Sequence, residues 1–451
     1  MRFQVANPKI SISLRCFEGL KPYFVRKLKD RNTCCCEHHV QLVYFKEALN
    51  QMRQGRFGLH GQPCNCRCGV CSSHDGTAQC TASNVTFPSL TDLWESVLCP
   101  KPIDCAYHCR QCLLGTCQLC GINKFSLCPH EKSDDISMMT IKLFDDVAIQ
   151  EVDETGQAKT RKDLVVRQVS PSNFTSLLQR KLGIFIQHNY KYRWQAEQFK
   201  VCLDTFPDDV VVSVVDFAEN YTFKVQNEIQ SMHWYSTQVT ILVHILYLRD
   251  VDGTIRKTTH FYISDDKTHD TLFVQHCFLL HNEWLKGQGC SVRRHWVWSD
   301  GAASQFKARC PFYFVARYFN MTRIEMMHNF FASGHGKGEH NGAGAVLKRA
   351  LTQEQLKSDG WVLYNASSVV AFLKKTLKRE CPLTGKKVDR RFWEIKLGDV
   401  DRDRDWDCMR IKGSRSFHCV KGYSKSDMHG LRCRPLSCFC HACMKGQWRS
   451  V

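Results

Sequence analysis

The sequence predicts a central mixed α/β domain flanked by small Cys/His-rich zinc-binding modules. In the middle of the chain, β-branched apolar runs alternate with segments of helical apolar spacing, which is the pattern of strands and helices in one domain. Sixteen of the 27 cysteines precede residue 130 and six follow residue 407. These cysteines crowd into C-x-C and C-x2-C pairs, which indicates metal binding in a reducing compartment.

We divide the chain into four parts. They are a Cys/His-rich zinc-binding region (1–130), a linker and helical connecting region (131–207), the α/β core (208–378) and a Cys-rich zinc-binding tail (379–451). Residues 131–171 are largely polar and predict an exposed hairpin or linker. The apolar spacing of residues 173–206 predicts a helix or two.

Three strands are predicted at the start of the core. Residues 209–216 (DVVVSVVD) form a β-branched run that ends in an acid, as a buried strand would. Residues 238–249 and 254–264 are the next strands, and Asp252-Gly253 between them is a strong hairpin signal.

Helices and strands then alternate. The predicted elements are a helix at 269–286, a strand at 292–298, a helix at 302–319, a strand at 323–332 and a helix from about 343. The resulting order, β-β-β-α-β-α-β-α, is that of the RNase H-like fold.

Two acids follow strands of this domain. Asp216 ends the first strand and Asp300 follows the fourth, so both carboxylates are expected at one edge of the sheet. Phosphodiester cleavage uses divalent metals, and Mg²⁺ or Mn²⁺ takes carboxylate ligands. The competing interpretation is that each Asp only ends its strand in a turn.

Three motifs carry a family resemblance: DFAENY from Asp216, SDGAASQFK from Ser299 and HGKGEHNGAGAVLKR from His335. Together they resemble Mutator-like, transposase-derived proteins with a DDE/D catalytic core. The resemblance implies an RNase H-like fold, divalent metal ions and DNA as substrate. An Asp usually precedes the G-x-G in that group, but this chain has Asn341 there. Glu339 is then the candidate third catalytic acid, beside Asp216 and Asp300.

Basic and aromatic residues near this edge are candidates for DNA contact. The net charge of +18 attracts polyanions, nucleic acid first. The candidates for phosphate contact or base stacking are His335, Lys337, Lys348, Arg349 and Trp234. The alternatives are a glycine-rich turn that only packs a helix on the sheet, a solvated basic face and a tryptophan in the core.

The cysteine clusters predict structural zinc, because closely spaced thiolates supply tetrahedral ligands in pairs. The N-terminal candidates are Cys64, Cys66, Cys68 and Cys71, followed by Cys105, Cys109, Cys112, Cys117, Cys120 and Cys128. The C-terminal candidates are Cys433, Cys438, Cys440 and Cys443, for which reduced buried thiols are the alternative.

These features leave three functional hypotheses. The first is a DNA transposase or domesticated remnant that performs metal-dependent strand cleavage and transfer. The second is a non-catalytic nucleic-acid or chromatin-binding protein that retains the fold, as Asn341 would favour. The third is a zinc-dependent ubiquitin ligase or another protein-interaction factor built on the N-terminal cysteines.

The longest mainly apolar run, residues 239–248, is too short to cross a bilayer, and the first residues lack a secretory signal. We therefore expect a soluble, intracellular, nuclear protein with DNA as its partner and no membrane. A homo-oligomer is compatible with this expectation.

Overall fold

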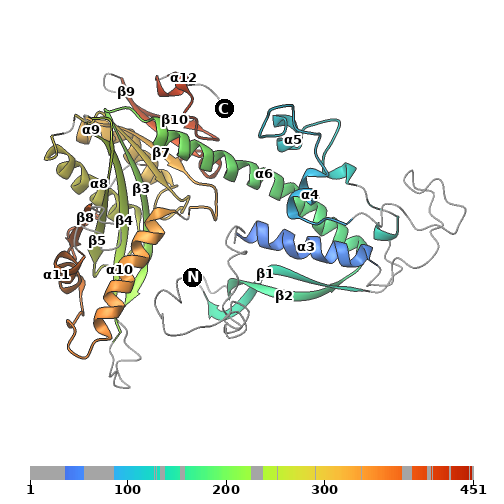
Figure 1. The fold of residues 1–451 in the computed structure, drawn as a ribbon, viewed down its shortest axis with the longest axis horizontal. Coiled ribbons are helices and arrows are strands. Elements are labelled where there is room, and N and C mark those ends of the chain that lie inside the picture. The colour runs from blue at the N-terminus through green and yellow to red at the C-terminus, as the bar shows by residue number, and fades with distance from the viewer. Residues whose placement is uncertain are drawn as a thin grey trace, which may run out of the picture. The chain divides into compact units, whose positions relative to one another are not determined.

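The structure is a computed structural model of the chain (Figure 1). It describes residues 36–54, 86–125, 127, 129–132, 138–152, 158–224, 237–250, 252–289, 291–336, 338–377, 389–403, 408, 410–425, 428–445 and 447–448. The chain forms two compact units. The first unit is Met1–Leu90 with Ser126–Leu178, and the second is Thr91–Phe125 with Gln179–Val451.

The first unit packs a helix on a hairpin. Helix α3 (Glu37–Arg53) buries an apolar stripe that includes Leu42, Phe45 and Leu49. Strands β1 (Met139–Val152) and β2 (Ala158–Val169) pair antiparallel, which confirms the predicted hairpin. The Arg53 side chain forms an ion pair with Glu131 at 2.8 Å, with both side chains almost fully buried. A short 3-10 helix, η4 (Pro129–Lys132), supplies that glutamate.

The second unit is built on an eight-stranded mixed sheet in the order β10-β9-β7-β6-β3-β4-β5-β8 (Figure 1). Its strands are β3 (Val210–Thr222), β4 (Gln238–Arg249), β5 (Ile255–Ser264), β6 (Arg294–Ser299), β7 (Glu325–Phe330), β8 (Asp389–Ile395), β9 (Cys419–Lys425) and β10 (Met428–Arg434). Strands β3, β4 and β5 form an antiparallel meander, while β6 is parallel to β3 and β7 is parallel to β6. The predicted mixed α/β class is confirmed.

Helices cover both faces of this sheet. Helices α10 (Glu339–Gln355) and α11 (Ala366–Thr376) contribute to an apolar core that includes Val212 and Trp298. Helices α8 (Thr271–Lys286) and α9 (Arg309–Thr322) contribute to a second core that includes Val215 and Val297. Because side chains alternate along a strand, neighbouring residues of β3 and β6 enter opposite cores. From β3 to α10 the elements follow the predicted order.

The smaller helices complete the second unit. They are α4 (Leu90–Glu95), of which all but Leu90 falls in this unit, α5 (Arg110–Leu114), η3 (Ile122–Lys124), η5 (Ser414–Ser416) and α12 (His441–Met444).

Helix α6 (Pro171–Thr205) is one continuous helix of 35 residues, where the sequence predicted a helix or two. In the part of the chain that the structure describes, no helix has the length and apolarity needed to span a membrane.

The C-terminal segment differs from the predicted separate tail. Strand β8 pairs parallel with β5, and β9 pairs antiparallel with β7. The described strands after residue 388 therefore extend the core sheet at both edges. Each is seven residues long and only partly apolar, so the sequence pattern did not distinguish them from a tail.

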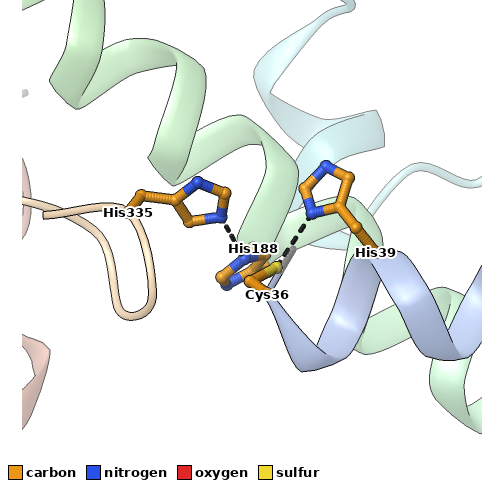
Figure 2. A group of neighbouring side chains, drawn as sticks. All are labelled: Cys36, His39, His188 and His335. Carbon is orange, nitrogen blue, oxygen red and sulfur yellow. Dashed lines mark hydrogen bonds between the residues drawn. The ribbon is translucent and has the colours of Figure 1, made fainter. Parts of the chain in front are cut away.

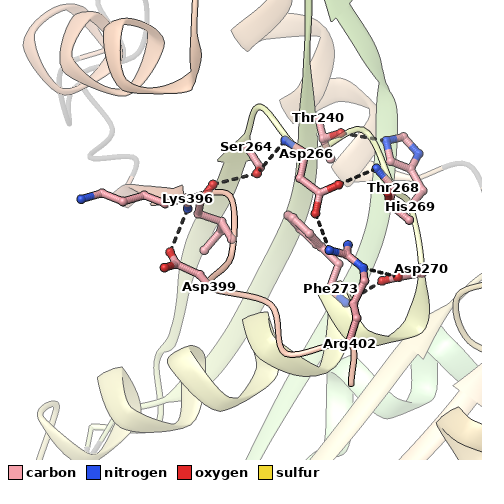
Figure 3. A network of polar contacts seen from close by, with 11 residues as sticks. Thr240, Ser264, Asp266, Thr268, His269, Asp270, Phe273, Lys396, Asp399 and Arg402 are labelled. Carbon is pink, nitrogen blue, oxygen red and sulfur yellow. Dashed lines mark hydrogen bonds and ion pairs between the residues drawn. The ribbon is translucent and has the colours of Figure 1, made fainter. Parts of the chain in front are cut away.

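Polar contacts fasten the segment after β8 to the start of α8 (Figure 3). The Arg402 guanidinium lies 2.7 Å from a carboxylate oxygen of Asp266 and 2.7 Å from one of Asp270. The other oxygen of Asp270 accepts a hydrogen bond from the backbone N–H of Phe273 at 2.8 Å. Asp270 therefore caps α8 and holds Arg402 at the same time.

Candidate functional site

Two acids lie side by side on neighbouring parallel strands. Asp300 directly follows β6, as predicted, but Asp216 does not end its strand, because β3 continues to Thr222. Val212 pairs with Trp296 and Val214 with Trp298, so Asp216 and Asp300 follow two residues later at the same level and on the same face. Burial, and then the charge of Asp216, raise the pKa of Asp300, against a hydrogen bond from the N–H of Ala302. The two carboxylates therefore interact electrostatically, and they form the centre of the candidate site.

His340 joins this pair from the first turn of α10. Its Nε2 lies 3.2 Å from Oδ2 of Asp216, and its side chain is almost fully buried. The side-chain nitrogen of Asn341 lies 3.1 Å from the same Nε2. Among the described residues, Nδ1 of His340 is a buried ring nitrogen without a hydrogen-bond partner. The site thus combines two carboxylates with an imidazole.

The three side chains are close without forming a tight cluster. Among the described residues, they do not belong to a group of ligand atoms that all lie within 4.8 Å of one another. To hold one ion at ligand distances of about 2 Å, the side chains must close on it.

The glycine-rich segment packs against these acids. A Cβ added to Gly336 would lie 3.1 Å from Cβ of Asp300, and one added to Gly344 would lie 3.3 Å from Cβ of Ala218. Both distances are tighter than most real contacts. These glycines allow α10 and its preceding loop to approach the sheet, which was the alternative interpretation of this motif.

A lysine that the sequence analysis did not single out lies beside Asp300. Lys307 ends the SDGAASQFK motif, is buried, and its ammonium lies 5.1 Å from the centroid of the Phe330 ring. Burial, and then the charge of Lys191, lower the pKa of Lys307 to about 8, although Asp300 opposes the shift. A cation is therefore held near the acidic pair.

A pocket of about 310 Å³ opens beside Asp216. Its lining includes Glu219, His340, Asn341 and Lys348. Lys348 lies 3.8 Å from a carboxylate oxygen of Glu219, which is 94% exposed. Arg349, the next residue on α10, is exposed. Of these two predicted DNA-contact residues, Lys348 therefore lies in the pocket beside Asp216, and Arg349 lies outside its lining.

Glu339 does not join the acidic pair, contrary to its predicted role. Its Oε2 accepts a hydrogen bond from the Tyr247 hydroxyl at 3.0 Å and forms an ion pair with Lys257. Tyr247 lies opposite Val212 in the sheet, four residues along β3 from Asp216. Consecutive helical residues point about 100° apart, so when His340 faces Asp216, Glu339 points elsewhere.

His335, another predicted DNA contact, is held against α6. Its Nε2 lies 2.8 Å from Nε2 of His188 (Figure 2). Its ring also stacks on Tyr192, with centroids 3.8 Å apart. Figure 2 also shows a pair from the first unit, Cys36 and His39, whose Sγ and Nδ1 lie 2.9 Å apart. The predicted contacts Lys337 and Trp234 lie outside the described residues.

Four cysteines of the second unit form a candidate zinc site. The sulfur atoms of Cys99, Cys112, Cys117 and Cys120 all lie within 4.8 Å of one another. Hydrogen bonds from the backbone N–H groups of Leu119 and Cys120 lower the pKa of Cys117 to about 7, which favours its thiolate. Four thiols in one cluster are the donor set of structural zinc.

The predicted membership of this site was partly wrong. Cys99 was missed, because it belongs to no C-x2-C pair. Cys105 and Cys109 are exposed and lie outside the group. The remaining predicted N-terminal ligands lie outside the described residues: Cys64, Cys66, Cys68, Cys71 and Cys128.

At the other end, the sulfur atoms of Cys438, Cys440 and Cys443 lie within 4.8 Å of one another. The predicted ligand Cys433 lies on β10, outside this group. A guanidinium nitrogen of Arg434 lies 3.3 Å from Sγ of Cys443. A metal held here takes three thiolates and a further donor.

A family model described as "Domain of unknown function (DUF8701)" matches residues 195–434, more than half of the chain. The chain belongs to this family. The DUF8701 match includes Asp216, Asp300 and His340, whereas the two cysteine groups lie outside it.

Among solved structures, the DUF8701 chain is similar to one titled "Crystal structure of NurA bound to dAMP and manganese". The identity is 13%, the match covers 44% of this chain and 45% of that chain, and the TM-score is 0.15. This similarity is too low to indicate a shared fold. No curated protein matches the chain.

Proposed function

We propose that this DUF8701 protein is a transposase-derived, DNA-binding protein whose RNase H-like core holds a divalent metal ion at the edge of the sheet. The observation that carries the proposal is the placement of Asp216 and Asp300 at the same level on adjacent parallel strands. The element order from β3 to α10 supports the RNase H-like assignment. The motifs that contain Asp216 and Asp300 support the Mutator-like one.

The acidic pair favours a further cation because Lys307 balances its charge only in part: the pKa of Asp300 stays raised although Lys307 opposes the rise. Burial and Asp216 both raise the pKa of Asp300, and a divalent ion would relieve that cost. Asp216 and Asp300 would hold the ion, with His340 as the third ligand. An imidazole beside two carboxylates fits Mn²⁺ better than Mg²⁺, which is bound mainly through oxygen.

The proposed partner is DNA. The net charge of +18 gives the long-range attraction, and cationic side chains near the acids give short-range contacts to phosphate. Lys307 lies beside Asp300, and Lys348 lines the pocket that contains Asp216. Because its partner is DNA, we expect the protein in the nucleus.

Strand cleavage and transfer would require the metal ion, and in this proposal His340 completes the site that holds it. When bound, the ion would activate a water or a 3′-hydroxyl and stabilise the leaving oxygen. Asp216 and Asp300 would hold the ion in position, and Lys307 would offset the charge of the phosphate. Glu339 has no part in this, since Tyr247 and Lys257 hold it.

The second candidate function is nucleic-acid or chromatin binding without cleavage. Two observations favour it: Asn341 stands where the family's acid is expected, and Glu339 is held away from the pair. Both candidates share the fold and the DNA partner, but only the first cleaves and transfers DNA strands.

The test compares Mn²⁺ binding and plasmid nicking for the full-length protein and four variants. We expect Asp216→Asn and Asp300→Asn to abolish Mn²⁺ binding measured by calorimetry. His340→Ala should weaken that binding roughly 10–100-fold, the loss that follows when a residue that only orients a metal ligand is removed. Glu339→Gln is the matched acid control and should bind like the wild type. Mn²⁺ binding without nicking selects the non-catalytic candidate, and unchanged binding in Asp216→Asn and Asp300→Asn rejects the metal site.

A further inference from the structure

Three histidines meet inside the second unit, on the face of the sheet opposite the acids. His244 lies on β4, His281 on α8 and His295 on β6, and their ring nitrogens lie within 4.8 Å of one another. Their exposed fractions are 1%, 0% and 0%. Val215 pairs with His244 and Asp216 with Val243, so His244 points away from the acidic pair.

Hydrogen bonds account for only some of the ring nitrogens of these three histidines. The Ser213 hydroxyl lies 2.8 Å from Nε2 of His244 and 2.6 Å from Nε2 of His295. Among the described residues, neither ring nitrogen of His281 has a hydrogen-bond partner, nor does Nδ1 of His295. Buried polar groups are normally paired, because an unpaired one loses its hydration without compensation. Three such nitrogens in one cluster indicate a missing partner.

The surroundings favour neutral rings. Burial lowers the pKa of His295 to about 3. Burial, and then the neighbouring histidines, hold the pKa of His244 and of His281 well below the ordinary value. Neutral imidazole is the form that binds a metal.

We propose that His244, His281 and His295 bind a divalent transition-metal ion of the zinc class. Zinc takes imidazole nitrogens at about 2.0–2.1 Å in a tetrahedron, which sets neighbouring nitrogens about 3.3 Å apart. The three ligand nitrogens lie within 4.8 Å of one another, so the rings would have to move together to reach that spacing. The Ser213 hydroxyl, already beside two of the rings, stands next to the fourth position.

The site is structural rather than catalytic. It is fully buried, and among the residues that the structure describes no acid belongs to the group. The ion would tie β4 and β6, the two neighbours of β3, to helix α8. It would thereby fix the sheet that carries Asp216 and Asp300. The proposal does not rest on the DNA function, because none of its ligands lies at the acidic site.

The direct test uses crystals of the full-length protein purified with zinc. Anomalous difference maps above and below the zinc absorption edge locate each ion. We expect a peak bonded to nitrogens of all three histidines. A peak at the Cys99 group would serve as an internal reference in the same map. Only water, or no density, between the three rings would overturn the proposal.

A solution test uses matched buried histidines. His281→Asn should lower the zinc content of the full-length protein by one ion per chain. His328→Asn is the control, because His328 is also buried but lies 2.8 Å from the Ser299 hydroxyl and belongs to no such group. Zinc content unchanged in His281→Asn would contradict the proposal. Should that variant not fold, the anomalous map of the wild type still decides the matter.

Discussion

Nε2 of His340 lies 3.2 Å from Oδ2 of Asp216, which joins the first turn of α10 to the middle of the core strand β3. An imidazole therefore occupies the place beside the acids where the family resemblance led us to expect a carboxylate. The consequence concerns charge, because two carboxylates and a neutral ligand bind a divalent ion less strongly than three carboxylates. The affinity of this site for a divalent ion should therefore change when a single charge is added or removed beside Asp216 and Asp300.

Asp300→Asn should stabilise the metal-free protein at neutral pH. The pKa of Asp300 is raised by burial and by Asp216, so the protonated carboxyl is favoured in the folded state. That contribution is complete below the unfolded pKa of about 3.9 and is lost as the pH rises through the folded pKa. We expect the melting temperature at pH 7 to rise by roughly 1–3 °C.

The measurement is thermal unfolding with chelator across the pH range. The difference between Asp300→Asn and the wild type should disappear below about pH 4, where both side chains are neutral. Glu339→Gln is the control and should show no such gain, because Glu339 pairs with Lys257. A lower melting temperature for Asp300→Asn at pH 7 would contradict the interpretation.

Cys112→Ser should remove one zinc ion per chain. Cys112 is buried in the group with Cys99, Cys117 and Cys120, and losing one of four thiolates opens a structural site. Cys105→Ser is the matched control, because Cys105 is exposed and lies outside the group. Metal analysis of purified protein distinguishes the two variants. Equal losses in both would show that Cys105 is a ligand after all.

Arg402→Ala should destabilise the second unit modestly. Arg402 pairs with Asp266 and Asp270, and its side chain is 33% exposed. We expect a loss of about 1 kcal/mol, near the upper end for pairs at a surface. Lys286→Ala removes the more exposed pair with Glu283 and should change the free energy of unfolding by less. Urea unfolding measures both, and equal effects would argue against the role of the Arg402 network.

The sequence predicted the core elements because their patterns are strong. In the run 210–215 before Asp216 every residue but Ser213 is β-branched, and the pair Asp252-Gly253 separates two long strands. The parallel register of β3 and β6 then places Asp216 level with Asp300, although β3 continues beyond Asp216 to Thr222. The strands after residue 388 are short and mixed in polarity, so no pattern distinguished them.

The third site residue was mispredicted for a geometric reason. The last helix was expected from about residue 343, which would leave Glu339 and Asn341 on a loop that could turn either side chain toward the acids. In the structure α10 begins at Glu339, and a helix fixes which residues face the sheet. Cys99 and the buried histidines were missed for a related reason, since their spacing along the chain is long and only folding brings them together.

Asn341→Asp should increase the affinity for Mg²⁺. Asn341 lines the same pocket as Asp216, and its side chain lies 3.1 Å from His340. A carboxylate there would supply the oxygen ligand that the resemblance predicts and that Mg²⁺ prefers. We expect affinity to rise about tenfold, equivalent to about 1.4 kcal/mol, and nicking of supercoiled plasmid to appear or increase with it. The control is Gln353→Asp, which adds the same charge to an exposed position of α10. If both variants bind Mg²⁺ equally, general charge explains the gain, and position 341 does not belong to the metal site.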